Sequence, residues 1–161
     1  VMESMSDIVW AINPNKDHLR DLTQRMRRFA SDVFTARNID FKFIVPNSIQ
    51  DLKISAEARR QIFLIFKECV NNIVRHSRCT AAEIEMHIES GRVVLSVSDN
   101  GQGFSPGEIT DGNGLTNMKS RAKKLKGELK VESYPGKGTM IVFKIFPSAG
   151  VKHVREHSLQ R

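Results

Sequence analysis

The stretch that decides the fold is Val97-Ser98-Asp99-Asn100-Gly101-Gln102-Gly103-Phe104, where an apolar run stops at an acid and opens into a loop with two glycines. The preceding run, 93–97, is β-branched or apolar at most positions, which predicts a buried strand that ends near Asp99. An Asp there has its backbone fixed from behind and is placed to accept a hydrogen bond from a ligand amine. Gly101 and Gly103 allow positive φ and let a flat ligand approach the backbone closely. Taken alone, a tight Asp-Asn-Gly turn closing a hairpin explains the stretch better.

Two further segments favour the ligand-binding interpretation over a simple turn. Upstream, Lys67-Glu68-Cys69-Val70-Asn71-Asn72-Ile73-Val74-Arg75-His76-Ser77 places three polar residues at four-residue steps along one helical stripe: Glu68, Asn72 and His76. Downstream, Gly112-Asn113-Gly114-Leu115 opens a predicted helix, and Gly136-Lys137-Gly138-Thr139 comes just before a predicted last strand.

The three motifs, in this order and at this spacing, resemble the ATP-binding domain of the GHKL superfamily. Within it the sequence is most similar to sensor histidine kinases of two-component systems, in the branch whose helix motif reads Glu-x-x-x-Asn-x-x-x-His-Ser. The resemblance covers about residues 5–147. It implies the Bergerat fold, an α/β two-layer sandwich with a mixed, mostly antiparallel sheet and helices on one face.

The hydrophobic pattern by itself also predicts a two-layer α/β arrangement. The expected elements are the tail of a helix or an ordered turn within 1–13, helices over 17–37, 55–76 and 115–126, and strands over 41–45, 52–54, 82–89, 92–98, 129–131 and 140–146. A tight hairpin fits at Ser90-Gly91, and 105–113 is predicted to be a polar loop. A P-loop enzyme is disfavoured because no Gly-x-x-x-x-Gly-Lys-Ser/Thr sequence is present.

Composition indicates one soluble globular domain, with 161 residues, 40% hydrophobic and 27% charged. No apolar run approaches the ~20 residues that span a bilayer. The net charge of +7 suits a polyanionic ligand, nucleic acid or a membrane surface, but the basic residues are scattered among acids with few aromatics, which argues against a nucleic-acid reader. Cys69 and Cys79 lack metal or redox spacing and are expected to be free thiols.

The resemblance also divides the chain. Residues 1–14 are expected to be the end of a dimerisation and phosphoacceptor helix with its linker, 15–147 the ATP-binding catalytic domain, and 148–161 a frayed tail. His18 does not match the family's phosphoacceptor setting, so the accepting His is expected on a dimerisation helix outside this fragment. The full-length protein is then expected to be a membrane-linked homodimer at the inner membrane, with this domain in the cytoplasm and a response regulator as partner.

Site roles follow from the resemblance. Asp99 is the expected acceptor for the adenine amine, Asn72 the magnesium ligand and Glu68 the general base. Other expected contacts with the nucleotide lie on four segments: Arg75 and His76; Gly101, Gly103 and Phe104; Gly112, Gly114, Leu115, Lys119 and Arg121; and Thr139. The loop 105–113 is expected to close over ATP as a lid.

Several of these residues keep a plainer interpretation. Gly112-x-Gly114 also suits a flexible loop before an ordinary helix, although amides at a helix start bind phosphate well. His76 also suits a helix terminus, where the dipole favours a cation. The hydroxyl of Thr139 is expected to hydrogen-bond near the adenine or the Asp99 carboxylate, or else the segment is a hairpin turn.

Two classes of alternative function remain open. One is another GHKL member: an anti-sigma-factor serine kinase, or, less favoured, an ATP-driven clamp, since the chain ends soon after the last motif. The other is a non-catalytic basic interaction module in which every glycine is a turn. That interpretation leaves unexplained why nine of the ten glycines fall between Gly91 and Gly138.

Overall fold

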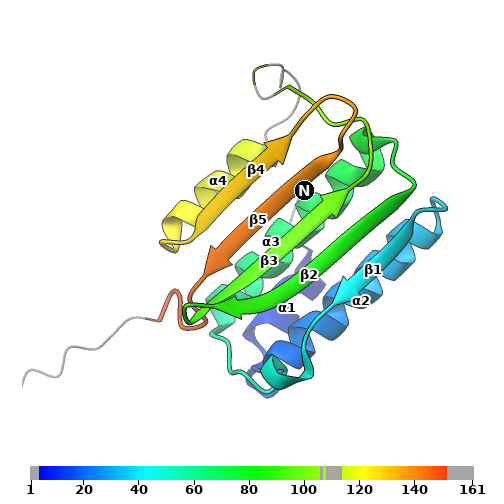
Figure 1. Ribbon diagram of the computed structural model, residues 1–161. Coiled ribbons are helices and arrows are strands. Elements are labelled where there is room, and N and C mark those ends of the chain that lie inside the picture. The colour runs from blue at the N-terminus through cyan, green and yellow to red at the C-terminus, as the bar shows by residue number, and fades with distance from the viewer. Residues whose placement is uncertain (1–3, 106, 108–113, 152–161) are drawn as a thin grey trace, which may run out of the picture.

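The computed structural model describes residues 4–105, 107 and 114–151, which form α-helices packed on one five-stranded sheet (Figure 1). In chain order the elements are α1 (Met5–Ile12), α2 (Leu19–Thr35), β1 (Asp40–Ile44), α3 (Ala56–Asn72), β2 (Ala81–Glu89), β3 (Arg92–Asp99), α4 (Gly114–Lys124), β4 (Glu128–Ser133) and β5 (Thr139–Ile145). Short 3₁₀ turns lie at Pro14–Lys16 and Asn47–Ile49, and a π turn at Ile73–Ser77. No helix in the described part of the chain is both long and apolar enough to cross a bilayer.

The sheet has the strand order β1-β2-β3-β5-β4, with β1 and β2 parallel and the remaining neighbours antiparallel. Ser90 and Gly91 both have positive φ, 50° and 74°, so the tight hairpin predicted between β2 and β3 is confirmed. The register places Asp99, at the end of the central strand, opposite Ala82 on one side and Thr139 on the other.

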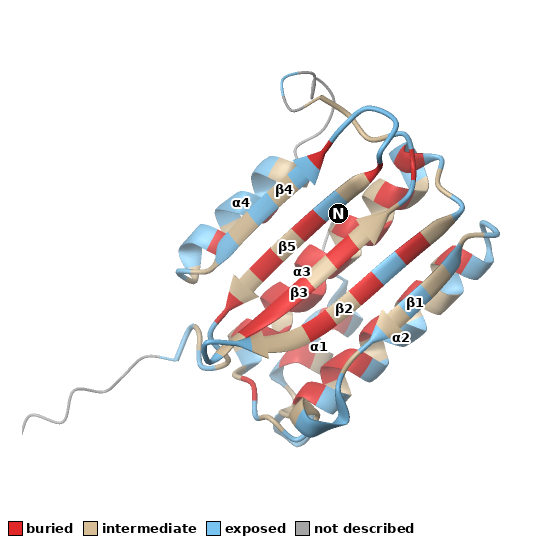
Figure 2. Cartoon of the chain, viewed as in Figure 1, coloured by how far each residue is buried: buried red, intermediate tan, exposed pale blue. Residues whose placement is uncertain are grey.

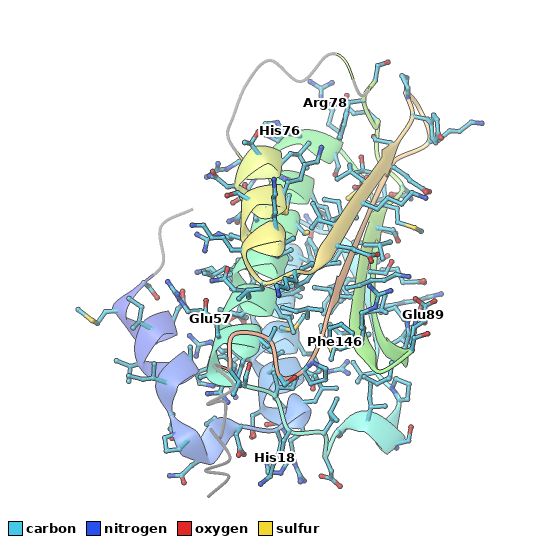
Figure 3. The ribbon with its side chains drawn as sticks, turned by 90° about the vertical axis from the view of Figure 1, so that its left-hand side faces the viewer. His18, Glu57, His76, Arg78, Glu89 and Phe146 are labelled. Carbon is cyan, nitrogen blue, oxygen red and sulfur yellow. The ribbon has the colours of Figure 1, made fainter. Side chains whose placement is uncertain are left out.

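The helices cover one face of the sheet, as Figure 3 shows with the sheet edge-on, so the predicted two-layer sandwich is confirmed. Buried residues alternate with exposed ones along the strands (Figure 2), the pattern of a sheet with one solvated face. The core between the layers includes Ile62, Ile65 and Phe66 of α3, Ile84 and Met86 of β2, Leu95 of β3 and Phe143 of β5, each at most 2% exposed. Burial of this apolar surface holds the site-bearing α3 against β3.

The long central helix departs from the prediction near its end. Regular α-helix stops at Asn72 and the chain continues through the π turn Ile73–Ser77, where the Ser77 hydroxyl donates to the Ile73 carbonyl at 2.7 Å. Arg78 then takes a left-handed conformation, φ 53°, which ends the helix. His76 therefore does not continue the α-helical stripe of Glu68 and Asn72.

The strand predicted at 52–54 is wrong. This segment makes only an isolated bridge between Lys53 and His18. Its backbone instead serves the start of α2: the Leu52 carbonyl accepts from the Leu19 N–H, and the Ile54 N–H donates to the Asp17 carbonyl, both at 2.8 Å. The first N–H groups of a helix need hydrogen-bond partners outside the helix. Here the backbone of 52–54 bonds with residues at the start of α2 and does not join the sheet.

Candidate functional site

The Asp99 carboxylate at the end of β3 is half-buried and held by backbone. It accepts hydrogen bonds from the Gly101 N–H, at 2.8 Å, and from the Thr139 backbone N–H. Burial raises the pKa of Asp99, and the two amide bonds offset only part of that effect. The bond to Gly101 is the local turn bond of an Asp-x-Gly sequence, so the carboxylate is oriented before any ligand binds.

The glycines beside Asp99 are packed against protein backbone. A Cβ on Gly101 would overlap the Ser77 carbonyl, and one on Gly103 would overlap the Tyr134 carbonyl. A Cβ on Gly138 would overlap the carbonyl of Asp99 itself. Gly103 and Gly138 also have positive φ, 61° and 76°. Neighbouring backbone therefore fills the side on which a Cβ would lie at Gly101 and Gly103, and of these two glycines only Gly103 has positive φ. Their contact with a ligand stays a prediction.

Ser133, at the end of β4, joins this loop to β5. Its hydroxyl lies 2.8 Å from the hydroxyl of Thr139 and accepts the Phe104 N–H at 2.9 Å. The Thr139 hydroxyl thus pairs with Ser133, whereas the Thr139 backbone N–H supports Asp99. The Thr139 hydroxyl therefore pairs with Ser133 at the end of the sheet, a partner that the sequence did not predict.

The loop after Asp99 is tied to the turn that follows Asn72. The Gln102 N–H donates to the Ser77 carbonyl at 2.7 Å, and the Gln102 amide group donates to the His76 carbonyl at 2.6 Å. A helix end leaves its last carbonyls without intrahelical partners, and Gln102 satisfies two of them. The positions of β3 and the end of α3 are therefore fixed relative to each other.

Glu68 and Asn72 lie together against the first residue of α4. A Cβ built on Gly114 would overlap Glu68 Oε1 and would lie 3.6 Å from Asn72 Oδ1. The helix start thus meets a carboxylate and an amide oxygen spaced one turn apart on α3. Backbone N–H groups at a helix start carry partial positive charge, so this junction combines an acid with anion-binding amides.

A small polar pocket opens beside Glu68, lined by Leu64, Glu68, Asn117, Met118 and Arg121. Arg121 Nη1 donates to Gln61 Oε1 at 3.2 Å, which holds the guanidinium over α3. Asp99 does not line this pocket. The described residues therefore form two clusters, one around Asp99 and one around Glu68, linked through Ser77 and Gln102.

The other predicted residues are placed less specifically. The side chains of Arg75, His76 and Lys119 are exposed, whereas Phe104 and Leu115 are half-buried. Figure 3 shows His76 at the same end of the molecule as Arg78, past the last turn of α3. Gly112 and most of the predicted lid, 105–113, lie outside the described residues.

Three site residues were missed by sequence reasoning. Asn117 lines the pocket with Arg121, and their four-residue spacing on α4 is the signal that would have found it. Ser133 and Gln102 carry no signal in a single sequence, because their partners are brought close only by the fold.

The donors around Asn72 suit a hard cation. Amide and carboxylate oxygens are the ligands that Mg²⁺ takes in proteins, usually few of them together with water and phosphate oxygens. No group of three or more His, Cys, Asp or Glu residues that suits a metal ion occurs among residues 4–105, 107 and 114–151.

Comparison with solved structures defines the class of fold. The histidine kinase domain of the blue-light activated histidine kinase from Erythrobacter litoralis EL346 matches with a TM-score of 0.66 and 20% identity, over 79% of this chain and 65% of that one. The catalytic domain of histidine kinase ThkA matches with a TM-score of 0.64 and 21% identity, over 81% and 94%. The fold is that of histidine kinase catalytic domains.

Sequence comparison then gives the family. The profile described as "Histidine kinase-, DNA gyrase B-, and HSP90-like ATPase" matches residues 57–149, more than half of the chain, so the chain belongs to this ATPase family. Sensor histidine kinase LiaS of Bacillus subtilis is 35% identical over 114 residues, covering 69% of this chain and 32% of LiaS. The sensor protein VraS of Staphylococcus aureus is 33% identical over 101 residues. The chain spans about a third of the length of these relatives.

Proposed function

We propose that this chain is the ATP-binding catalytic domain of a sensor histidine kinase, which transfers the γ-phosphoryl group of ATP to a histidine for relay to an aspartate of a response regulator. The observation that carries the proposal is the meeting of Glu68, Asn72 and the start of α4. An acid, an oxygen ligand and helix-start amides are what a triphosphate and an accepting imidazole require at one place. The similarity to LiaS and VraS supports the same function.

In this proposal Asp99 binds the adenine. Its oriented carboxylate accepts a hydrogen bond from the exocyclic amine, with the loop of Gly101, Gly103 and Phe104 alongside. The raised pKa of Asp99 shows that burial already disfavours its charge, so a donor from the ligand relieves that cost. Guanine presents a carbonyl in the corresponding place and is disfavoured.

The triphosphate lies toward α4. The amides following Gly112 and Gly114, with Leu115 at the first turn, bind phosphate oxygens, and Arg121 adds charge from the pocket beside Glu68. Arg75, His76 and Lys119 are exposed and could add positive charge to the phosphate contacts. Asn72 would hold Mg²⁺ through its amide oxygen, and the bound ion would neutralise part of the phosphate charge.

Glu68 acts on the accepting imidazole. One ring nitrogen of the incoming histidine attacks the γ-phosphorus in line, and the bond to the bridging oxygen breaks, so that ADP leaves with the electron pair. Glu68 accepts a hydrogen bond from the other ring N–H and takes up that proton as the ring becomes phosphorylated. The products are N-phosphohistidine, with a neutral ring and a negatively charged phosphoryl group, ADP, and Glu68 carrying the proton.

The arrangement of the whole protein belongs to the proposal. Residues 1–14 end a dimerisation helix and its linker, and 15–147 form the catalytic domain, placed in the cytoplasm of a membrane-linked homodimer. The predicted tail, 148–161, begins with a turn in which the Ala149 carbonyl accepts from Ser55 Oγ at 2.6 Å, and 152–161 lie outside the described residues. The serine-kinase alternative is less favoured because the named relatives are histidine kinases or sensor proteins.

The proposal is tested by the chemistry of the phosphorylated product. The full-length protein is incubated with γ-labelled ATP, and we expect acid-labile, alkali-stable label, as phosphohistidine gives. Glu68→Gln is expected to lower the rate by about 10²-fold or more, as loss of a general base does. Glu83→Gln, a matched change at an exposed position of β2, should leave the rate unchanged. Acid-stable phosphoserine would contradict the proposal in favour of a serine kinase.

A further inference from the structure

α1 lies outside the two layers, against α2 and α3, at the left edge of the molecule in Figure 3. The polar and aromatic contacts come from the Asp7 carboxylate, the Trp10 indole and the carbonyl groups of Ala11 and Asn13. Its only fully buried side chains are Asp7 and Ala11. Its outward face carries Met5, Val9 and Ile12, which are 77%, 58% and 66% exposed.

Asp7 makes the central contact. Its carboxylate accepts from Arg25 of α2 at 2.6 Å and from Lys67 of α3 at 2.8 Å, with side chains only 7%, 25% and 13% exposed. Burial by itself raises the pKa of Asp7, but hydrogen bonds from Lys67, Arg25 and Ser4 outweigh it and lower the pKa to about 2. The carboxylate is therefore ionised at neutral pH and bonds two different helices of the domain.

Trp10 adds an aromatic contact one turn further along. Its ring centroid lies 5.8 Å from that of Phe63, and the guanidinium groups of Arg25 and Arg59 lie 4.9 and 5.4 Å from its centroid. Three cations, Arg25, Arg59 and Lys67, thus surround α1 on the domain side. Without the Asp7 carboxylate these cations would face one another with less compensation.

Arg59 holds the end of α1. It is 1% exposed, and its Nη2 donates to the carbonyls of Ala11 and Asn13, the latter at 3.3 Å. Nε and Nη1 of Arg59 are buried without a hydrogen-bond partner. The Arg59 guanidinium thus uses only one of its nitrogens for hydrogen bonds, and these bonds go to the last carbonyls of α1, where the helix dipole favours a cation.

α1 has little stability of its own. A helix of eight residues is too short to persist alone in water, even with the Ser4 capping box that it carries. Its exposed apolar face gains nothing from the contact with the domain. What keeps it in place is therefore the polar contact through Asp7, the bonds from Arg59 and the Trp10 ring, which packs at the edge of the core that the sheet shares with α3.

We propose that Asp7, Arg25 and Lys67 form a latch: the carboxylate fastens α1 to the domain, and its loss lets residues 4–13 swing free about Asn13-Pro14 while the domain stays folded. Lys67 directly precedes Glu68 in α3, so the latch contacts the residue next to the proposed catalytic acid, a relation that rests on the proposed function.

The test uses Trp10, the single Trp in the chain, and amide hydrogen exchange. In the unchanged protein we expect amides of α1 to exchange through a local opening, faster than those of β3. Asp7→Asn should speed exchange of α1 amides by about 100-fold, the factor expected when two charge-assisted hydrogen bonds are lost, and leave β3 unaffected. Trp10 emission should shift to the red and acrylamide quenching should rise several-fold.

The matched control is Asp51→Asn, which removes an exposed ion pair to Arg20 and should change neither α1 exchange nor Trp10 quenching. Two results overturn the latch: α1 amides that exchange only together with β3 in the unchanged protein, or Asp7→Asn with Trp10 quenching equal to that of the parent. The first measurement needs no variant. A failure of nucleotide binding would contradict the proposed function and leave these exchange results standing on their own.

Discussion

The two clusters of the candidate site are built by different means. Around Asp99, backbone packs on backbone: Gly101, Gly103 and Gly138 each fill a position where a Cβ would overlap a carbonyl. Around Glu68, side chains meet a helix start, and the atom nearest to Gly114 is the far end of a flexible carboxylate. The first cluster has no room to adjust, whereas the second can move by rotating one side chain.

The rigid Asp99 cluster suits ligand recognition, and the adjustable Glu68 cluster suits the transfer reaction. Adenine recognition needs one fixed geometry, since a single donor and a flat ring have to be matched. Phosphoryl transfer needs groups that adjust as the triphosphate and the accepting imidazole arrive. Substitutions in the Asp99 cluster should therefore act on stability and nucleotide affinity, and those in the Glu68 cluster on metal use and rate.

The largest effect is expected for Gly138→Ala compared with Gly136→Ala. Both glycines have nearly the same positive φ, 76° and 77°, but only a Cβ on Gly138 overlaps backbone, while the space beside Gly136 is open. Gly136→Ala should cost about 1–2 kcal/mol, the price of the conformation alone. Gly138→Ala should cost more than about 3 kcal/mol in urea unfolding, because a clash is added. Equal losses would show that the backbone contact is unimportant.

Asp99→Asn comes next and should leave the fold intact. The amide keeps the size of the carboxylate but loses its charge and turns an NH₂ group toward possible donors. We expect ADP affinity to fall by about 10- to 100-fold in calorimetry, the range for a hydrogen bond to a charged group. Asp40→Asn, on the exposed edge strand β1, is the control and should bind ADP normally. Unchanged affinity in Asp99→Asn would remove Asp99 from the site.

The pH dependence of binding sharpens this assignment. Burial raises the pKa of Asp99 above the ordinary value of 3.8. If Asp99 binds adenine as proposed, its ionised form accepts the hydrogen bond, so affinity should be complete above the pKa of Asp99 and fall as the pH drops through that pKa, while the pH is still above 3.8. Asp99→Asn should lack this step, and titrations of both proteins against pH separate it from protonation of the adenine.

Asn72→Asp should change metal use more than nucleotide affinity. An added carboxylate beside Glu68 attracts Mg²⁺ more strongly and repels phosphate when no metal is present. We expect the Mg²⁺ concentration needed for half-maximal binding of an ATP analogue to shift several-fold. Asn71→Asp makes the same charge change on another side of α3 and should shift it less. The same metal dependence in both variants would argue against Asn72 as a ligand.

Gly114→Ala is expected to have the smallest effect on stability. Its new Cβ meets the end of the Glu68 side chain, which can rotate away, and Ala favours the helix. The free energy of unfolding should change by less than about 1 kcal/mol, and the phosphorylation rate should fall because Glu68 is displaced. A loss as large as that of Gly138→Ala would show that the Glu68 cluster is also rigid.

Much of the fold followed from the sequence because its signals are local. The two strand-like runs in 82–98 and the four-residue step from Glu68 to Asn72 in α3 are each set within one segment, and the two strands and the helix that they predict are present. The strand at 52–54 failed because the amides of α2 compete for its backbone, a contact across the fold. The close packing that requires glycine at 101 and 103 could not be predicted for the same reason, because the carbonyls that it involves, of Ser77 and Tyr134, are distant in sequence.

The most direct test of a shared adenine-nucleotide site is a calorimetric titration of the unchanged chain with ATP and GTP analogues, each with and without Mg²⁺. We expect the ATP analogue to bind much more tightly than the GTP analogue, and more tightly with the metal present. Equal binding of the two nucleotides, or no binding of either, would contradict the assignment of Asp99 and Asn72 to one site.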